Sequence, residues 1–257
     1  MKRLLILFVV AVALGAPSAA LASGVVLKVQ RANHLVAVTR TATKVALVHT
    51  SAATRLHVGQ RVSLTARTLR NGTLAAATVR VVGRAHTVRF RGLLLSKSRT
   101  RLIVSAGGAV IALNRGRATA SASDGNPSPQ PGSTVDVTAT VGQNDDLDED
   151  TVDTVSADAP GGAIEGKLTI GAGKVTIVSE HMALVLNVPT GFDLTKFANG
   201  DEVLAKFTQG ADGTLTLTSL SGDDNAQEAD QNDDNDDNGD NGGDGDHQGG
   251  DGHGDDG

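Results

Sequence analysis

Glycine residues recur along this 257-residue chain in two series that have almost the same period. Each glycine of the first series begins a strand-like run, and the glycines are 68 and 74 residues apart: Gly24, Gly92 and Gly166. In the second series, each glycine stands three positions before a valine: Gly59, Gly132 and Gly200. Chance placement would not keep two such spacings in parallel, so the series predict three tandem copies of one structural unit.

The residues between these glycines alternate between apolar and polar types, with many β-branched side chains, a pattern typical of β-strands. Turn signals such as Asn71-Gly72 separate the runs. The first unit contains five strand-like runs, at 25–29, 34–39, 44–49, 61–69 and 74–82. Five short strands in so few residues suit a small barrel of the OB type. The sequence therefore predicts an all-β protein of three tandem small OB-like five-stranded β-barrel modules, followed by a disordered acidic tail.

These repeats set the predicted domain bounds: a signal peptide at 1–22, a basic module at 23–84, a second module at 85–158, a third module at 163–222 and a tail at 223–257. The second module carries two apparent insertions, a Ser- and Pro-rich loop at 121–129 and an acidic excursion at 144–150 in place of its last hairpin. The tail has no Val, Leu or Ile, so it cannot bury a core and is expected to be disordered.

The first 22 residues have the order of a secretory signal peptide. Lys2 and Arg3 precede an apolar run that ends near Gly15, and Ala20 and Ala22 form a small-x-small site. The run is shorter than the roughly 20 apolar residues that span a bilayer. We therefore expect cleavage after Ala22 and a secreted or cell-envelope protein, with no transmembrane segment in the mature chain.

Composition excludes several classes of site. The chain has no Cys, Trp or Tyr and only five Phe. Disulfide scaffolds, Cys-ligated metals and Cys nucleophiles are therefore excluded, and aromatic stacking of bases or sugars is disfavoured. The sequence has no G-x-S-x-G, H-E-x-x-H or phosphate-loop motif. We therefore expect a protein that is not an enzyme and has no cofactor beyond weakly held Ca²⁺.

Charge is distributed very unevenly. Residues 23–120 hold seventeen Lys and Arg and no acid, whereas residues 121–222 hold fifteen acids and four Lys. The tail adds fourteen acids and no base. A segment of one sign favours binding to a polymer of the opposite sign, and Arg suits bidentate contacts to phosphate or carboxylate. The predicted polyanion-binding residues are Arg31, Arg40, Lys44, Arg55, Arg61, Arg67, Arg70, Arg80, Arg84, Arg89, Arg91, Arg99 and Arg101.

Two acidic runs are candidate Ca²⁺ sites because they place carboxylates at alternate positions, as hard cations require. The second run fits the first half of an EF-hand loop, but Gly245 stands where the bidentate Glu belongs. A merely solvated acidic run is the alternative for both. The candidate ligands are Asp146, Asp148, Asp150, Asp234, Asp236 and Asn238. Four histidines of the basic segment have no carboxylate near them in sequence, so a cation site there is disfavoured: His34, His49, His57 and His86.

The run Gly200-Asp201-Glu202-Val203, followed by the hairpin signal Asp212-Gly213, resembles tandem OB-like small β-barrel modules of a bacterial secreted domain-of-unknown-function family. The resemblance spans residues 24–222, although Gln60 and Ser133 replace the aspartate in the first two units. It implies the fold and an extracytoplasmic role, and it carries no catalytic residues.

Two functions are therefore expected. The first is an exported, non-catalytic binding protein that engages an anionic cell-envelope polymer or surface through its Arg-rich first third. Without aromatic platforms it would read backbone charge and would not read nucleic-acid sequence. The alternative is a structural or assembly protein of the cell envelope that binds an unidentified envelope protein and responds to Ca²⁺ through its acidic loop and tail.

Overall fold

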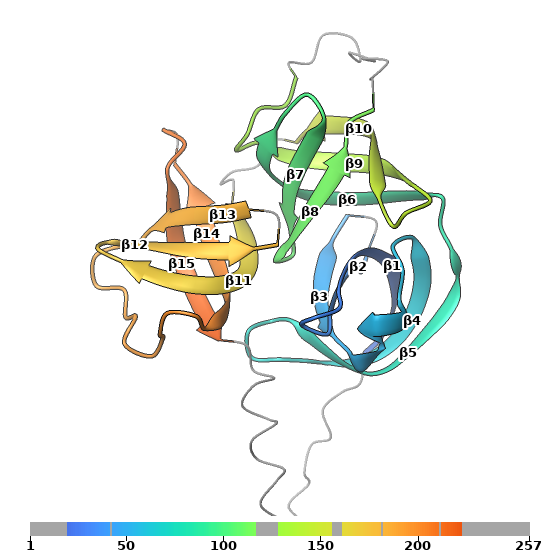
Figure 1. The fold of residues 1–257 in the computed structure, drawn as a ribbon, viewed down its shortest axis with the longest axis horizontal. Coiled ribbons are helices and arrows are strands. Elements are labelled where there is room, and N and C mark those ends of the chain that lie inside the picture. Colours follow the sequence, from blue (N-terminus) through green and yellow to red (C-terminus); the bar gives the residue numbers. More distant parts are fainter. Residues whose placement is uncertain are drawn as a thin grey trace, which may run out of the picture. The chain divides into compact units, whose positions relative to one another are not determined.

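The structure is a computed structural model that describes residues 20–41, 43–116, 128–155, 161–180, 182–210 and 212–222. These residues form fifteen strands and one short 3-10 helix, arranged in three closed five-stranded barrels (Figure 1). The predicted all-β class and the three small barrels are confirmed. The predicted signal peptide and the predicted disordered tail at 223–257 lie outside the described residues, apart from Ala20–Ala22. No helix in the described part of the chain is long and apolar enough to cross a membrane.

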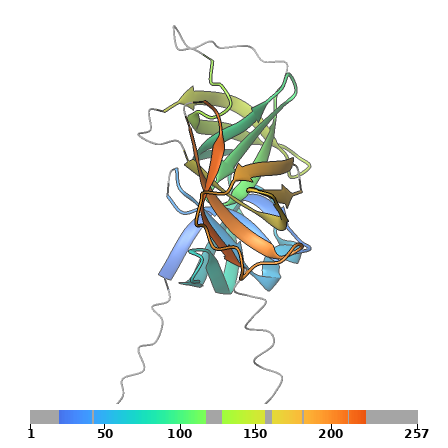
Figure 2. The same ribbon diagram turned by 90° about the vertical axis from the view of Figure 1, so that its left-hand side faces the viewer.

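Each barrel is built from five consecutive strands. Barrel 1 contains β1 (Ala20–Gln30), β2 (Leu35–Thr39), β3 (Val45–His49), β4 (Gln60–Thr68) and β5 (Leu74–Arg84), with the 3-10 helix η1 (Ser51–Arg55) before β4. Barrel 2 contains β6 (Thr87–Lys97), β7 (Arg101–Ala106), β8 (Ala109–Asn114), β9 (Thr134–Val141) and β10 (Leu147–Thr154). Barrel 3 contains β11 (Gly161–Gly171), β12 (Lys174–Ser179), β13 (Met182–Asn187), β14 (Glu202–Gln209) and β15 (Leu215–Gly222), whose path can be followed in yellow to red in Figure 2.

All three barrels have the same topology. The first strand pairs antiparallel with the second and the fourth, and the third strand pairs parallel with the fifth. Barrels 2 and 3 repeat this arrangement, including the parallel pairs β8–β10 and β13–β15. The resulting order, 1-2-3-5-4 and back to 1, is that of an OB-type barrel.

The two glycine series have separate physical causes. A Cβ on the first glycine of each barrel would meet the backbone oxygen of the second strand, at 1.7 Å for Gly24, 2.3 Å for Gly92 and 2.3 Å for Gly166. The first strand therefore needs a glycine to approach its neighbour this closely. The glycines of the second series have φ angles of +82°, +94° and +98°, which form the left-handed turn into the fourth strand: Gly59, Gly132 and Gly200.

The barrels pack on one another through their sheet faces. In barrel 1, Val36 and Val38 of β2 point into the barrel core, whereas Leu35 and Ala37 belong to the same apolar cluster as the core of barrel 2. Leu47 of β3 joins that second cluster. Strand β2 is therefore buried on both faces, which explains its uninterrupted apolar sequence.

Backbone hydrogen bonds also join neighbouring barrels. The hairpin between β2 and β3 presents the oxygen of Thr43, which accepts a bond of 2.8 Å from the nitrogen of Arg91 in barrel 2. The hairpin between β7 and β8 presents the oxygen of Gly108, which accepts a bond of 3.0 Å from the nitrogen of Glu165 in barrel 3. Arg91 and Glu165 each directly precede the first-series glycine of their barrel. The same contact is therefore used twice, and the three barrels form one compact unit.

One expectation about barrel 2 is wrong. The acidic run at 144–150 is not an excursion that replaces the last hairpin, because it forms that hairpin and the start of β10. Leu147 is buried, and the acids beside it lie at the outer face or the turn. A strand whose outer face meets water can carry charges at these positions, so the acidic composition concealed it. Most of the other predicted insertion, 121–129, lies outside the described residues.

Candidate anion-binding groove

A groove of about 430 Å³ lies where barrel 1 meets the start of barrel 2. Three of the predicted polyanion-binding residues, Arg40, Arg61 and Arg89, line it together with hydroxyl-bearing residues such as Thr41 and Thr87. No carboxylate is among the residues that line it. Because three arginines line one hollow without a carboxylate among the lining residues, it is the candidate site for an anion.

The strand alternation explains why these arginines face the groove. On β4, Val62 points into the core, so the preceding residue, Arg61, lies on the outer face. On β6, Val88 and Phe90 are buried, and Arg89 between them is exposed. Arg40 directly follows β2, and its backbone nitrogen bonds the oxygen of Lys44 at 2.7 Å, which closes the loop between β2 and β3.

Asp136 on β9 is bonded to Arg89, one of the arginines that line this groove. It accepts a bidentate pair of bonds from Arg91, 2.6 Å from Nε and 3.0 Å from Nη2, and a longer bond of 3.3 Å from Arg89. The hydrogen bond from Arg91 lowers the pKa of Asp136 and raises that of Arg91. Arg91 is therefore held by an acid of its own barrel, and Arg89 is shared between Asp136 and the groove.

The remaining predicted basic residues do not gather in one place. Arg31 and Arg101 line a second cavity, which contains acids as well. The others are not among the residues that line the groove: Lys44, Arg55, Arg67, Arg70, Arg80, Arg84 and Arg99. Three of the thirteen predicted residues therefore line the groove, and the binding role of all thirteen stays a prediction.

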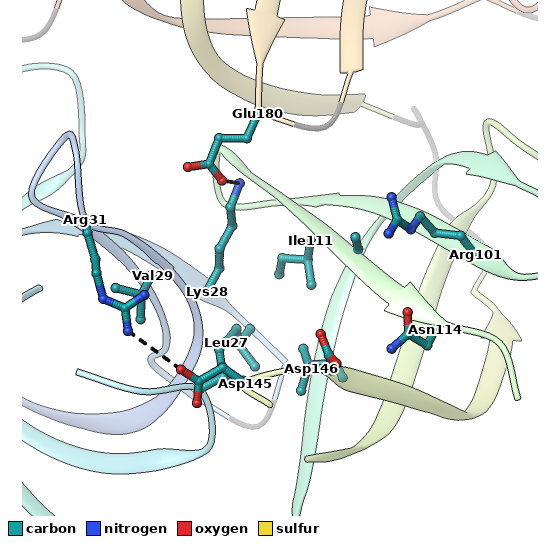
Figure 3. Close-up of a pocket in the computed structure, with 13 residues that line it drawn as sticks. Leu27, Lys28, Val29, Arg31, Arg101, Ile111, Asn114, Asp145, Asp146 and Glu180 are labelled. Atoms are coloured by element: carbon teal, nitrogen blue, oxygen red, sulfur yellow. Dashed lines mark ion pairs between the residues drawn. The ribbon is translucent and has the colours of Figure 1, made fainter. Parts of the chain in front are cut away.

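The second cavity, of about 280 Å³, is lined by residues from all three barrels (Figure 3). Lys28 of barrel 1 meets Glu180 of barrel 3, with 3.2 Å between Nζ and Oε2. Asp145 of barrel 2 lies 3.7 Å from Arg31 and 2.8 Å from Nδ1 of His57, both in barrel 1. Because acids line this cavity and pair with Lys28 and Arg31, it suits an anion less well than the groove does.

Sequence reasoning missed these acidic partners. His57 has no carboxylate near it in sequence, but Asp145, 88 residues away in the chain, lies 2.8 Å from its Nδ1. Asp136 could have been found: it occupies an outer position on an alternating strand, as Arg89 and Arg91 do on β6. The pairing of Asp136 with Arg91 on β6 can be predicted only when the barrel topology is known. The contacts of Asp145 can be predicted only when the packing between barrels is known.

The three candidate Ca²⁺ ligands that the structure describes lie along one hairpin. Asp146 lies in the turn before β10, whereas Asp148 and Asp150 lie on the strand, where Asp150 accepts a hydrogen bond from Thr140. Among the residues that the structure describes, no group of three or more His, Asp or Glu side chains is placed to hold a metal. Asp234, Asp236 and Asn238 lie outside the described residues.

No family model matches the chain, and no curated protein matches it. One similar solved structure is described as drosophila Unr CSD456, with 13% identity over 81% of this chain and 99% of that chain and a TM-score of 0.25. Another is a multidomain protein with nucleic acid binding domains from Streptococcus pneumoniae TIGR4, with 12% identity, coverage of 81% and 78%, and a TM-score of 0.21. Membership of a bacterial secreted family stays a prediction.

Proposed function

We propose that the protein is an exported, non-catalytic binding protein that holds an anionic polymer in the groove between barrels 1 and 2. One observation carries the proposal: Arg40, Arg61 and Arg89 line one hollow that no carboxylate lines. Guanidinium groups bind phosphate, sulfate and carboxylate with paired hydrogen bonds, and they keep their charge at all physiological pH values. The export of the chain rests on its signal-peptide pattern.

The chemistry of the groove favours charge recognition over recognition of a base or sugar. Its apolar lining consists of small aliphatic side chains such as Val25 and Val82, and the chain has no Trp or Tyr to stack on a ring. Hydroxyl groups of Thr39, Thr41 and Thr87 can add hydrogen bonds to anionic oxygens. A repeating phosphate or sulfate chain fits this lining.

The test compares two triple variants of the full chain that remove the same charge. The groove variant carries Arg40→Gln, Arg61→Gln and Arg89→Gln, and the control carries Arg55→Gln, Arg70→Gln and Arg99→Gln, all outside the groove. Binding of fluorescent polyphosphate and of heparin is measured between 25 and 200 mM salt. We expect the groove variant to bind about tenfold or more weakly at low salt, with a log–log salt slope smaller by about two to three.

The control variant should change affinity by no more than about threefold, because it alters only the general field of the protein. Equal losses in the two variants would show that the charge acts diffusely and would overturn the groove. Absence of binding by the unmodified chain at 25 mM salt would overturn polyanion binding altogether.

A specific observation also favours the alternative, an assembly function. In barrel 1 and barrel 2 the outer face of the second and third strands is covered, and Leu47 and Ser105 are each only 2% exposed. The registers place Val185 and Val178 at the corresponding positions of barrel 3, where they are 50% and 48% exposed. An uncovered apolar face of this kind is typical of a protein contact.

This alternative is tested by the oligomeric state and by affinity capture from a cell-envelope extract, with Val178→Lys and Val185→Lys as the disrupting changes. Self-association or capture that the two lysines abolish would support it. A chain that stays monomeric at all concentrations and captures the same proteins with and without the lysines would contradict it.

A further inference from the structure

Ser23 lies among the residues that line the anion-binding groove, together with Gly24, Arg61 and Arg89. It is also the first residue after the predicted cleavage site at Ala22. We propose that cleavage of the signal peptide completes the groove, because it converts the backbone nitrogen of Ser23 from a neutral amide into an α-ammonium group. This inference rests on the proposed function, and it adds a fourth cation to the three arginines.

The register of β1 indicates where that nitrogen points. Ser23 pairs with Ser63 on β4, as Arg91 pairs with Asp136 and Glu165 with Leu204 in the other barrels. At the two later positions the nitrogen does not donate to the fourth strand. It donates outward, to the hairpin oxygen of the barrel before it: Thr43 for Arg91 and Gly108 for Glu165.

No barrel precedes barrel 1 in the described part of the chain, so no hairpin of that kind covers the nitrogen of Ser23. Ser23 is exposed. From the register shared with Arg91 and Glu165, we infer that the nitrogen of Ser23 faces the groove. A ligand oxygen can there take the place that a hairpin oxygen takes in barrels 2 and 3. An ammonium there offers three donors instead of one.

The charged groups around this position come from three elements. Arg40 follows β2, Arg61 lies on β4 and Arg89 on β6, and all three line the same groove. The one described carboxylate paired with them, Asp136, is bonded to Arg89 from the side of β9. A fourth positive charge in such surroundings favours a multiply charged ligand, so we expect a polymer of phosphate or sulfate groups and not a single carboxylate.

Cleavage also shortens the ladder between β1 and β4. Ala20, Leu21 and Ala22 pair with Ala66, Thr65 and Leu64, and these three pairs are lost. The pairs from Ser23 to Val25 with β4 remain, as do all described pairs of β1 with β2. The barrel therefore keeps its closure, and the amino terminus stays within the sheet at the edge of the groove.

The test uses the chain secreted by cells that express the full sequence, after its intact mass has shown an amino terminus at Ser23. Periodate cleaves an amino-terminal serine between its amine- and hydroxyl-bearing carbons, which replaces the ammonium by a neutral glyoxylyl group. The control begins at Ala20 and receives the same periodate treatment. It undergoes the same oxidation of Met182 and keeps an ammonium, but three residues away from the groove.

Fluorescent polyphosphate is the probe. We expect oxidation of the Ser23 form to lower affinity several-fold at 50 mM salt and to reduce the log–log salt slope by about one, since one cation is lost. Affinity of the untreated form should also fall from about pH 6.5 to about pH 9.5, a range in which an ordinary α-amino group loses its proton. The oxidised form should show no such fall, and the Ala20 form should be unchanged by periodate.

The possible failures are distinguishable. If the Ser23 form binds polyphosphate through its arginines but oxidation changes neither affinity nor pH dependence, this inference is overturned and the proposed function stands. A mature chain that begins elsewhere than at Ser23 also overturns the inference. If no form binds polyphosphate at low salt, both proposals are overturned.

Discussion

The backbone oxygen of Gly108 in barrel 2 accepts a hydrogen bond of 3.0 Å from the backbone nitrogen of Glu165 in barrel 3. Thr43 and Arg91 make the corresponding contact between barrels 1 and 2. Because both bonds use only main-chain atoms, the contact between neighbours does not depend on which side chain occupies the position. It depends on the close approach of a hairpin, and this makes the hairpin glycines sensitive to substitution.

Gly107→Ala should destabilise the protein strongly. Its φ is +59°, and an added Cβ would lie 2.2 Å from the backbone oxygen of Val45 in barrel 1, which cannot move independently of β3. The matched control is Gly72→Ala, at φ +88° with nothing within 4 Å of the added Cβ. The control should cost about 1 kcal/mol for the left-handed backbone, and Gly107→Ala about 2 to 4 kcal/mol in urea unfolding. Equal costs would contradict the contact between barrels 1 and 2.

The apolar contact between barrels predicts a second contrast. Leu47→Ala removes a side chain that is 2% exposed and packs in the cluster shared with barrel 2, so it should cost about 2 to 4 kcal/mol. Val185→Ala, at the equivalent position of barrel 3 and 50% exposed, should cost less than about 1 kcal/mol. Urea midpoints of the two variants measure the difference. A small cost for Leu47→Ala would mean that barrel 2 does not cover this face.

The glycine periods and the apolar alternation were sufficient to predict the three barrels, because each barrel is fixed by contacts within about 70 residues. The alternation of apolar and polar residues did not predict β10, because Leu147 is the one buried side chain of that strand. It could not show that β2 is buried on both faces, since the second face is covered by another barrel. Packing between repeats depends on three-dimensional complementarity that periodicity does not encode.

Asp136 should make the free energy of unfolding depend on pH in the acidic range. Its pKa is lowered, chiefly by the hydrogen bond from Arg91, so the folded chain keeps this carboxylate ionised where the unfolded chain binds a proton. The contribution is present above the ordinary pKa of an Asp and is lost as pH falls through the lowered value. Between about pH 5 and about pH 2, the urea midpoint of the unmodified chain should therefore fall more steeply than that of Asp136→Asn.

The control for this pH series is Asp148→Asn, which removes an exposed carboxylate of β10. Its midpoint should follow the unmodified chain across the acidic range. A parallel decline in all three proteins would show that Asp136 and Arg91 are not coupled to folding.

The same substitution should change ligand binding in the opposite sense to the loss of an arginine. Asp136 is bonded to Arg89 at 3.3 Å and to the neighbouring Arg91 at 2.6 Å, so it competes for Arg89 with any anion in the groove. Asp136→Asn should release both guanidinium groups, raise affinity for polyphosphate several-fold at 50 mM salt and steepen the salt slope by about one to two. Asp148→Asn, with the same charge change, is the control, and an equal gain in it would reduce the effect to net charge.

Counting charges along the sequence predicts only part of the candidate groove. The count identified the basic segment, and it included Arg40, Arg61 and Arg89 among its members. It could not show that Arg31, Arg91 and, more weakly, Arg89 meet acids, because Asp136 and Asp145 come from the later, acidic part of the chain. Pairing of this kind is non-local and becomes visible only when strand register and barrel packing are known.

The contact between Lys28 and Glu180 joins the first barrel to the last and predicts a coupling energy. The Lys28 side chain is 11% exposed, and its Nζ lies 3.2 Å from Oε2 of Glu180 in the cavity of Figure 3. Glu180→Gln leaves a largely buried ammonium without its opposite charge, which should cost about 1 to 2 kcal/mol, since the glutamate end is half exposed. Lys28→Met together with Glu180→Gln should recover most of that loss, because no charge remains to be desolvated. A double-mutant cycle in urea measures the coupling, and single costs that simply add would show that barrels 1 and 3 do not meet here.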